Sequence, residues 1–196
     1  MRFPALALAL GLFAAPAVQA ADVYGFDPGH TEVRATWNHV GFSNQSLTFR
    51  QIDGGVVIDL DNPANSSVDI TIPITGLDTG VDALNKHMLS GEMFDADSFP
   101  AARFVSTSVE KTGEMSLKVT GDLTLKDATK PVTLDVTINK IGENPVGQFL
   151  DYYKGQWVGV TASTTITRSD WGSNYGVPMF SDQIEILINA EMKAGL

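Results

Sequence analysis

The sequence predicts an all-β protein built from antiparallel strands. After residue 21, most of the chain consists of segments in which apolar and polar residues alternate. This period of two is typical of strands that bury one face. Gly, Pro, Asn and Asp separate the segments at short intervals, as in strands joined by tight turns. Only one stretch has helical character, so we expect a sheet that folds back on itself with little helix.

Residues 119–138 give the clearest strand signal. Apart from Gly121, apolar residues occupy alternate positions in residues 119–125 and again in 132–138, with a break at 127–131. This pattern predicts a β-hairpin with one row against a core. Two strands bury too little apolar surface to be stable alone, so the hairpin must belong to a larger sheet.

Eight segments carry the same alternation and are predicted to be strands. In chain order they span residues 31–40, 48–60, 67–72, 101–110, 115–125, 130–141, 156–167 and 183–192. Within the second segment we expect a bulge or sharp bend at Gly54-Gly55. The predicted helix spans Val81 to Leu89, with Asp82 in its first turn and a stop at Ser90-Gly91.

Eight antiparallel strands and one short helix are compatible with two architectures. A closed barrel has no exposed edges, and a barrel of eight strands has an interior that can hold one small ligand. A β-sandwich can be built from the same strands. The alternation pattern does not decide between them.

Residues 1–20 have the features of a secretory signal peptide. Arg2 provides a positive start, Ala5 to Ala15 is an apolar run, and Val18-Gln19-Ala20 has the small residues of a cleavage site. The run is shorter than the roughly 20 residues of a membrane anchor. We therefore predict cleavage after Ala20, an exported protein, and one domain over residues 21–196. We expect no stable membrane insertion.

Composition excludes several classes of function. The chain has no cysteine, which rules out a disulfide scaffold and thiol chemistry. Its formal net charge of −10 argues against nucleic acid and anionic membrane surfaces as partners. The three histidines lack the spacing of zinc ligands, so we predict no metal site. No nucleophile elbow or phosphate-binding loop is present, and we predict no catalytic residues and no cofactor.

Four segments in order resemble a known family. They are FDPGHTEVRATWNHVGF at 26–42, MFDADSFPAARFVSTSVE at 93–110, GDLTLKDATKPVTLDV at 121–136 and TTITRSDWG at 164–172. The chain resembles the YceI-like proteins, a family of bacterial periplasmic polyisoprenoid-binding proteins. The resemblance implies an eight-stranded antiparallel lipocalin-like barrel with one short helix, a long isoprenoid in its interior, a periplasmic location and no catalytic residues. The segment from Ser173 to Phe180 departs from the family pattern and could reshape a barrel mouth.

With that resemblance, the inward rows of the strands become the expected wall of a lipid site for an isoprenoid, an isoprenoid-quinone-like lipid or another long apolar molecule. The candidate ligand-binding residues are Val33, Trp37, His39, Phe42, Ile70, Phe104, Leu123, Leu134, Val160 and Trp171. His39 shares the row of Val33 and Trp37, so its imidazole either meets a ligand head group or is satisfied inside the fold.

Some alternatives stay open at this stage. Arg168 and Asp170 follow a strand and either fix a loop or bind an anionic head group. The function we expect is that of a non-enzymatic carrier. The rivals are an enzyme acting on an isoprenoid or ester at a barrel mouth, and a packed β-sandwich that serves as an adhesion or scaffold module. A homodimer also stays open.

Overall fold

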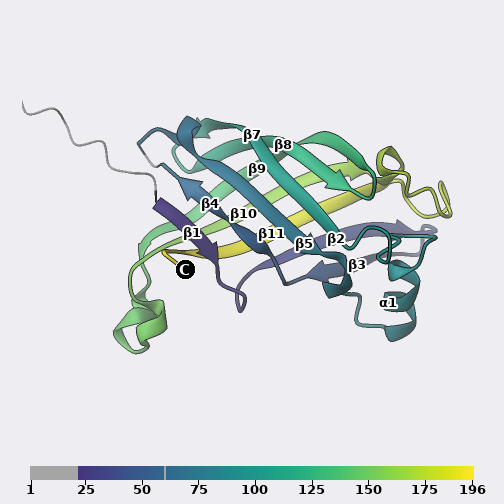
Figure 1. Ribbon diagram of the computed structural model, residues 1–196, viewed down its shortest axis with the longest axis horizontal. Coiled ribbons are helices and arrows are strands. Elements are labelled where there is room, and N and C mark those ends of the chain that lie inside the picture. The colour runs from purple at the N-terminus through teal and green to yellow at the C-terminus, as the bar shows by residue number, and fades with distance from the viewer. Residues whose placement is uncertain (1–21, 60) are drawn as a thin grey trace, which may run out of the picture.

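The computed structural model describes residues 22–59 and 61–196, and its strands are tilted relative to the long axis of the molecule (Figure 1). The predicted signal peptide, residues 1–20, lies outside the described residues. The strands are β1 (Asp22–Phe26), β2 (Glu32–His39), β3 (Ser43–Phe49), β4 (Asp53–Ile58), β5 (Ser67–Pro73), β6 (Leu77–Asp78), β7 (Ala101–Gly113), β8 (Ser116–Leu125), β9 (Ala128–Glu143), β10 (Gln156–Thr167) and β11 (Gln183–Ala194), with one α-helix, α1 (Asp82–Leu89).

The sheet closes on itself. Each strand in the order β1-β4-β5-β7-β8-β9-β10-β11 is hydrogen-bonded to the next, and β11 pairs back onto β1. All of these pairings are antiparallel. The structure therefore confirms the eight-stranded barrel, and the packed sandwich that the alternation pattern left open is wrong.

The remaining short strands extend three strands of the barrel. Along β11, Tyr24 of β1 lies opposite Ala194 and Val33 of β2 lies opposite Ile188, so β2 continues the path of β1. By the same reasoning β3 and β4 form one interrupted strand, because β3 pairs with β2 and β4 pairs with β1. β5 and β6 form another, because they pair with β4 and β3.

The position of one interruption corrects a prediction. We expected one strand over residues 48–60 with a bend at Gly54-Gly55. Instead β3 ends at Phe49 and β4 begins at Asp53, and the pairing of β4 with β5 runs through both glycines without a register shift. The break spans residues 50–52, and the inward residues change across it from odd positions, Leu47 and Phe49, to even positions, Val56 and Ile58.

The three interruptions lie at the same level of the barrel and form what we call the seam, residues 27–31, 50–52 and 74–76. Across the seam, Val33 pairs with Phe49 on one side and Tyr24 with Val56 on the other. On the β11 side the chain stays attached, because the Asp27 N–H donates to the Glu191 carbonyl at 2.8 Å.

Helix α1 covers one end of the barrel (Figure 1). It has Asp82 in its first turn and ends at Leu89 with Ser90 as its C-cap, as predicted, and it begins at Asp82, one residue after the predicted start at Val81. The Ser90 N–H donates to the His87 carbonyl at 3.0 Å, and the Ser90 hydroxyl donates to the same oxygen at 2.7 Å. Met88 is buried and packs in a cluster with Phe49 and Leu77.

The β8–β9 hairpin is present, and its turn is tighter than expected. Leu125 pairs with Ala128, which leaves only Lys126 and Asp127 between the strands, and Lys126 has a φ of 55°. In β8, a Cβ at Gly121 would lie 2.5 Å from the ring of Phe104. A side chain at this position would therefore displace that ring, which explains why a glycine interrupts the apolar row.

Candidate functional site

The barrel encloses an apolar cavity of about 700 Å³. Alternate residues of the strands supply its wall, because side chains of a strand point in turn to the two faces of the sheet. The row on β9 is Val132, Leu134, Val136 and Ile138, and the row on β11 is Ile184, Ile186, Ile188, Ala190 and Met192. The volume lies within the range of roughly 300–1,000 Å³ that is usual for small-molecule sites.

Eight of the ten candidate residues border this cavity. They are Val33, Trp37, His39, Ile70, Phe104, Leu123, Leu134 and Val160. Their inward position follows from the period-two rows. Contact with a ligand stays a prediction for each of them.

The other two candidates lie elsewhere. Phe42 is 92% exposed in the β2–β3 turn, because the chain leaves the strand row at Val40 and Gly41, which both have positive φ. Trp171 is only 3% exposed but lies in a 3-10 turn after β10, and its Nε1 donates to the Leu123 carbonyl at 3.1 Å. Neither residue contributes to the cavity wall.

Four rings gather at the α1 end of the cavity. The His39 and Phe180 ring centroids are 5.0 Å apart, those of Phe180 and Tyr175 are 6.2 Å apart, and those of Tyr175 and His87 are 4.9 Å apart. All four residues border the cavity. The polar atoms of three rings therefore border a chamber whose wall is mostly apolar, and Gln45, Lys126 and Arg168 also border it. The sequence pattern missed Tyr175 and Phe180, because they lie in a segment without strand alternation.

Arg168 fixes the segment that carries two of these rings. Its guanidinium is buried, and Nε donates to the Ser181 carbonyl at 3.0 Å while Nη1 donates to the Ser173 carbonyl at 2.7 Å. Nη2 donates to the carbonyls of Tyr175 at 2.9 Å and Phe180 at 3.2 Å. The interior position lowers the pKa of Arg168 below its ordinary value, because burial disfavours the charged form.

The carboxylate that supports this segment is Asp182. It accepts the Ser169 hydroxyl at 2.7 Å and the Ser169 N–H at 2.9 Å. The hydrogen bond from the Ser169 hydroxyl is the main cause that lowers the pKa of Asp182. In the described part of the chain no ion pair joins Arg168 to Asp170, so the arginine acts through backbone carbonyls rather than through that carboxylate.

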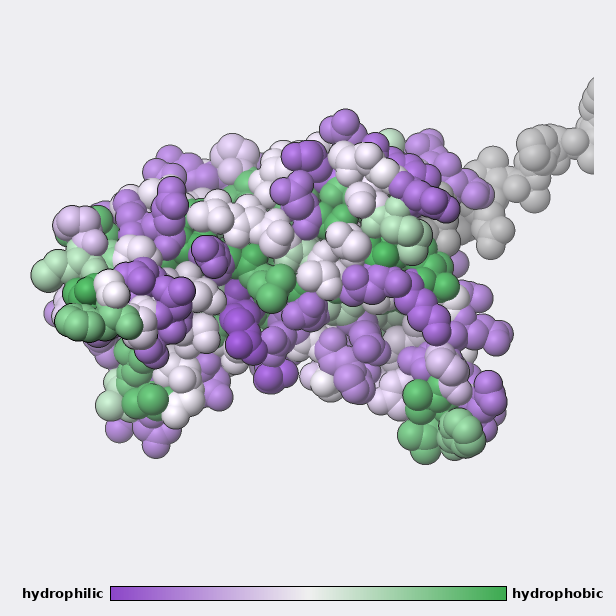
Figure 2. Space-filling model, turned by 180° about the vertical axis from the view of Figure 1, so that it is seen from behind, coloured by the Kyte–Doolittle hydropathy of each residue, from purple (hydrophilic) through white to green (hydrophobic). Residues whose placement is uncertain are grey.

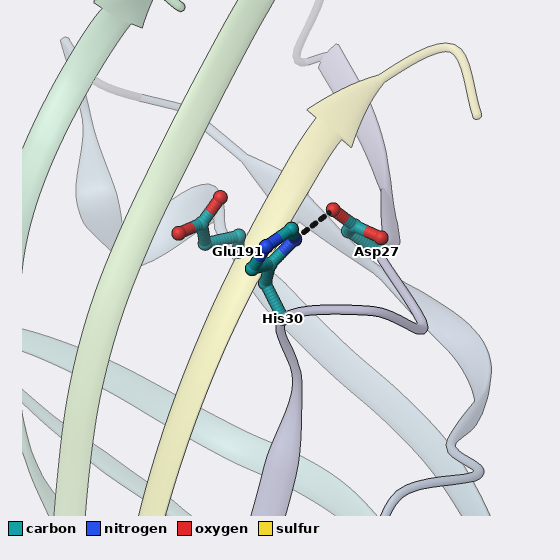
Figure 3. Close-up of side chains that lie close together, drawn as sticks. All are labelled: Asp27, His30 and Glu191. Atoms are coloured by element: carbon teal, nitrogen blue, oxygen red, sulfur yellow. Dashed lines mark hydrogen bonds and ion pairs between the residues drawn. The ribbon is translucent and has the colours of Figure 1, made fainter. Parts of the chain in front are cut away.

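A second polar group lies on the outside of the barrel, beside a smaller cavity of about 340 Å³. Asp27, His30 and Glu191 place their ligand-type atoms within 4.8 Å of one another. Figure 3 shows His30 turned toward Asp27, with Nδ1 of the ring 2.7 Å from Oδ2, and no bond drawn to Glu191. The other Asp27 oxygen accepts the Gly29 N–H at 2.9 Å.

These contacts explain the titration of both groups. Burial alone would raise the pKa of Asp27, but the hydrogen bonds from His30 and Gly29 outweigh it, and the pKa is lowered. The bond to Asp27 raises the pKa of His30. Both carboxylate oxygens of Asp27 are taken up by hydrogen bonds, to the Gly29 N–H and to His30. The Asp27–His30 pair therefore stabilises the turn of the chain at the seam.

Comparison with known proteins agrees with the geometry. A family model described as the YceI-like domain matches residues 24–192. A UPF0312 protein of Pseudomonas putida (strain W619) is 36% identical over 172 residues, 87% of this chain and 85% of that protein. Protein YceI of Shigella flexneri is 34% identical over 182 residues, 92% of this chain and 91% of that protein.

Two solved structures share the fold. The crystal structure of Burkholderia cenocepacia BcnA has a TM-score of 0.74 and 23% identity, over 85% of this chain and 99% of that chain. A domain from Saccharophagus degradans, described as a polyisoprenoid binding domain implicated in plant cell wall breakdown, has a TM-score of 0.65 and 12% identity, over 90% and 99%. Among the described residues, no helix is both long and apolar enough to cross a bilayer. By sequence and by fold, this chain belongs to the YceI-like family.

Proposed function

We propose that this protein is a periplasmic carrier that holds a long isoprenoid, or an isoprenoid-quinone-like lipid, inside its barrel without altering it chemically. The observation that carries the proposal is the cavity of about 700 Å³ with walls of aliphatic side chains. Such a wall offers contacts to hydrocarbon and few hydrogen bonds. A long, flexible, apolar chain is the ligand class that fits it.

The size of the cavity supports a bound guest. Protein interiors are packed to the density of organic crystals, and voids larger than a water molecule are few. Leaving a cavity of this size without contents would cost on the order of 10 kcal/mol in lost packing. This amount is comparable with the whole stability of a typical domain, about 5–15 kcal/mol. A hydrocarbon guest recovers those contacts.

The strength of binding would come from the tail of the ligand. Each methylene moved from water into the cavity contributes about 0.8 kcal/mol before the costs of ordering. A few isoprene units therefore suffice for tight binding. The head group would be read by the polar atoms at the α1 end, where His39, His87 and Tyr175 border the cavity. A related fold in Saccharophagus degradans is described as polyisoprenoid-binding, which supports the same ligand class here.

The engagement of two charged groups near this end of the cavity also favours a carrier over an enzyme. Arg168 is committed to backbone carbonyls, and Asp182 to Ser169. Neither is free to serve as an acid or base toward a bound lipid. The rival, an enzyme acting on an isoprenoid or ester at the barrel mouth, predicts turnover of a labelled substrate. A carrier returns the substrate unchanged.

The test is to identify what the protein holds. Protein purified from its native periplasm should release an isoprenoid lipid into organic solvent, detected by mass spectrometry at about one molecule per chain. The mature N-terminus should be Ala21, and the protein should be recovered without detergent. Extracts without isoprenoid lipid, combined with no uptake of an added isoprenoid alcohol, would overturn the proposal.

A further inference from the structure

The α1 end of the barrel carries exposed apolar side chains on two loops, which we call the rim (residues 38–44 and 173–181). Phe42 is 92% exposed and Met179 is 65% exposed. Figure 2 shows hydrophobic surface gathered at this end of the molecule, on the left of the view. A single exposed apolar side chain is common on protein surfaces, but here several lie together beside the mouth of the cavity.

The two loops of the rim form one platform. The Val40 N–H donates to the Met179 carbonyl at 3.1 Å, and the Ser181 N–H donates to the Asn38 carbonyl at 3.0 Å. His39 pairs with Phe180 in an isolated antiparallel bridge. The two loops that carry the apolar side chains are therefore joined by backbone bonds and are not independent of each other.

The rim is continuous with the cavity. Tyr175 is exposed to solvent and also borders the chamber, and His39 and Phe180 border it from the same loops. A ligand that leaves the chamber at this end would pass directly over the rim.

The rim also contains no charged residue. Asp, Glu, Lys and Arg make up 18% of the chain, yet none occurs in residues 38–44 or 173–181. The connection at the opposite end of β10, residues 144–155, is different. It also exposes large apolar side chains, among them Phe149 and Leu150, but it contains two charged residues, Asp151 and Lys154, which form an exposed ion pair at 2.6 Å. An apolar tip without charges can enter the headgroup region of a bilayer without the cost of desolvating an ion.

From these observations we infer that the rim docks onto a zwitterionic lipid bilayer, from which the proposed isoprenoid ligand enters the barrel. The inference rests on the proposed function. Moving a long hydrocarbon chain into water costs about 0.8 kcal/mol for each methylene exposed, which would slow its transfer through the aqueous phase. Direct transfer from a membrane into the barrel avoids this cost. The net charge of −10 opposes anionic surfaces, so docking relies on apolar contact.

The experiment measures vesicle binding and ligand uptake separately. Flotation with phosphatidylcholine vesicles reports docking, and a fluorescent isoprenoid alcohol reports uptake, offered either in those vesicles or dispersed in detergent. The variant Phe42→Ser/Met179→Ser should lower vesicle binding and the rate of uptake from vesicles by about tenfold or more, the effect of losing one or two buried apolar side chains. Its affinity for detergent-dispersed alcohol should stay unchanged, because neither side chain borders the cavity.

Matched controls keep the result specific. Phe149→Ser removes an equally exposed phenylalanine at the other end of the barrel and should leave both readouts unchanged. Phosphatidylglycerol vesicles should bind less well than phosphatidylcholine vesicles, most clearly at low salt. Absence of vesicle binding by the wild type, or equal weakening by Phe149→Ser, would overturn docking while uptake from detergent still stands. Failure of uptake from detergent would instead count against the proposed function.

Discussion

His39 and Phe180 are joined twice at the mouth of the barrel. Their backbones form an isolated antiparallel bridge, and their ring centroids lie 5.0 Å apart with an angle of 31° between the planes. The bridge holds the end of β2 against the segment before β11. It places an imidazole at the border of the cavity rather than deep in the core, since His39 is also exposed to solvent.

Replacing His39 should separate head-group recognition from tail binding. We expect His39→Ala to weaken binding of an isoprenoid that carries a polar head group by about 1 kcal/mol, the net contribution of one hydrogen bond. Binding of the bare hydrocarbon should be unaffected. His39→Gln, which keeps a polar side chain, should retain part of the difference. Calorimetric titration with both ligands decides: equal weakening, or none, rules out a head-group role.

Leu134 tests the wall of the chamber. Its side chain borders the cavity on β9 without a polar partner, so Leu134→Asp should destabilise the fold by about 2–4 kcal/mol or abolish lipid uptake, because it introduces an unpaired charge into an apolar space. Thr137→Asp, on the outward row of the same strand, is the control and should change neither. Urea unfolding and dye uptake measure the two effects. An unaltered Leu134→Asp protein would contradict the register of β9.

Arg168 should contribute far more stability than an exposed arginine. Arg168→Met removes the donors for four backbone carbonyls in the interior, and we expect a loss of about 2–4 kcal/mol together with faster proteolysis within residues 173–181. Arg103→Met breaks an exposed pair with Asp69 and should cost no more than about 1 kcal/mol. Comparable losses in the two variants would show that the carbonyl cluster does not depend on the guanidinium.

The Asp27–His30 pair predicts a specific dependence of stability on pH. Because the pKa of Asp27 is lowered in the folded protein, its carboxylate adds to the free energy of unfolding at any pH above the ordinary carboxyl pKa, about 3.9. This stabilisation is lost as the pH falls through the lowered pKa of the folded state. Because the pKa of His30 is raised in the folded protein, its imidazolium adds fully to the free energy of unfolding below the ordinary histidine pKa, about 6.5. This stabilisation is lost as the pH rises through the raised pKa of the folded state. Both contributions are therefore present between these two ordinary values.

The variants that test this pair are His30→Gln and Asp27→Asn. The gap in melting temperature between wild type and His30→Gln should be largest near pH 5 to 6 and should narrow toward pH 8. Asp27→Asn should cost about 1–3 kcal/mol near pH 5 to 6 and less toward pH 8, because the amide is a weaker acceptor than the buried carboxylate for the Gly29 N–H and for His30. Thermal melts at several pH values measure both. A gap for His30→Gln that widens as the pH rises would contradict the direction assigned to its pKa.

The strands and their inward rows could be predicted because period-two alternation records which face is buried. Residues such as Leu123, Leu134 and Val160 are placed by that rule alone. The rule fails where both faces are polar, as at the start of β3, Ser43-Asn44-Gln45-Ser46, which the sequence left outside any strand. The interruption between β3 and β4 does leave a signal, because the inward residues change from odd positions, Leu47 and Phe49, to even positions, Ile52, Val56 and Ile58. The prediction of one strand over residues 48–60 did not use this change of phase.

The mouth of the chamber could not be predicted from the sequence pattern. Its geometry depends on contacts between residues far apart in the chain, such as the hydrogen bond from the Asn38 N–H to the Ser181 hydroxyl, 143 positions away. Phe42 was expected at the ligand and instead lies outside the cavity, because two residues with positive φ turn the chain away. Alternation carries no information about such turns or about loop-to-loop pairing.

The seam gives the barrel one compliant half and one stiff half. On the side formed by the first six short strands, three neighbouring breaks coincide, so the wall can bend there without unzipping a continuous ladder. Strands β7 to β11 run for 10 to 16 residues each, and their ladders shift register only at bulges, in the β7–β8 and β9–β10 pairings. Any change in the width of the bore would therefore be taken up at the seam, where no continuous ladder has to break.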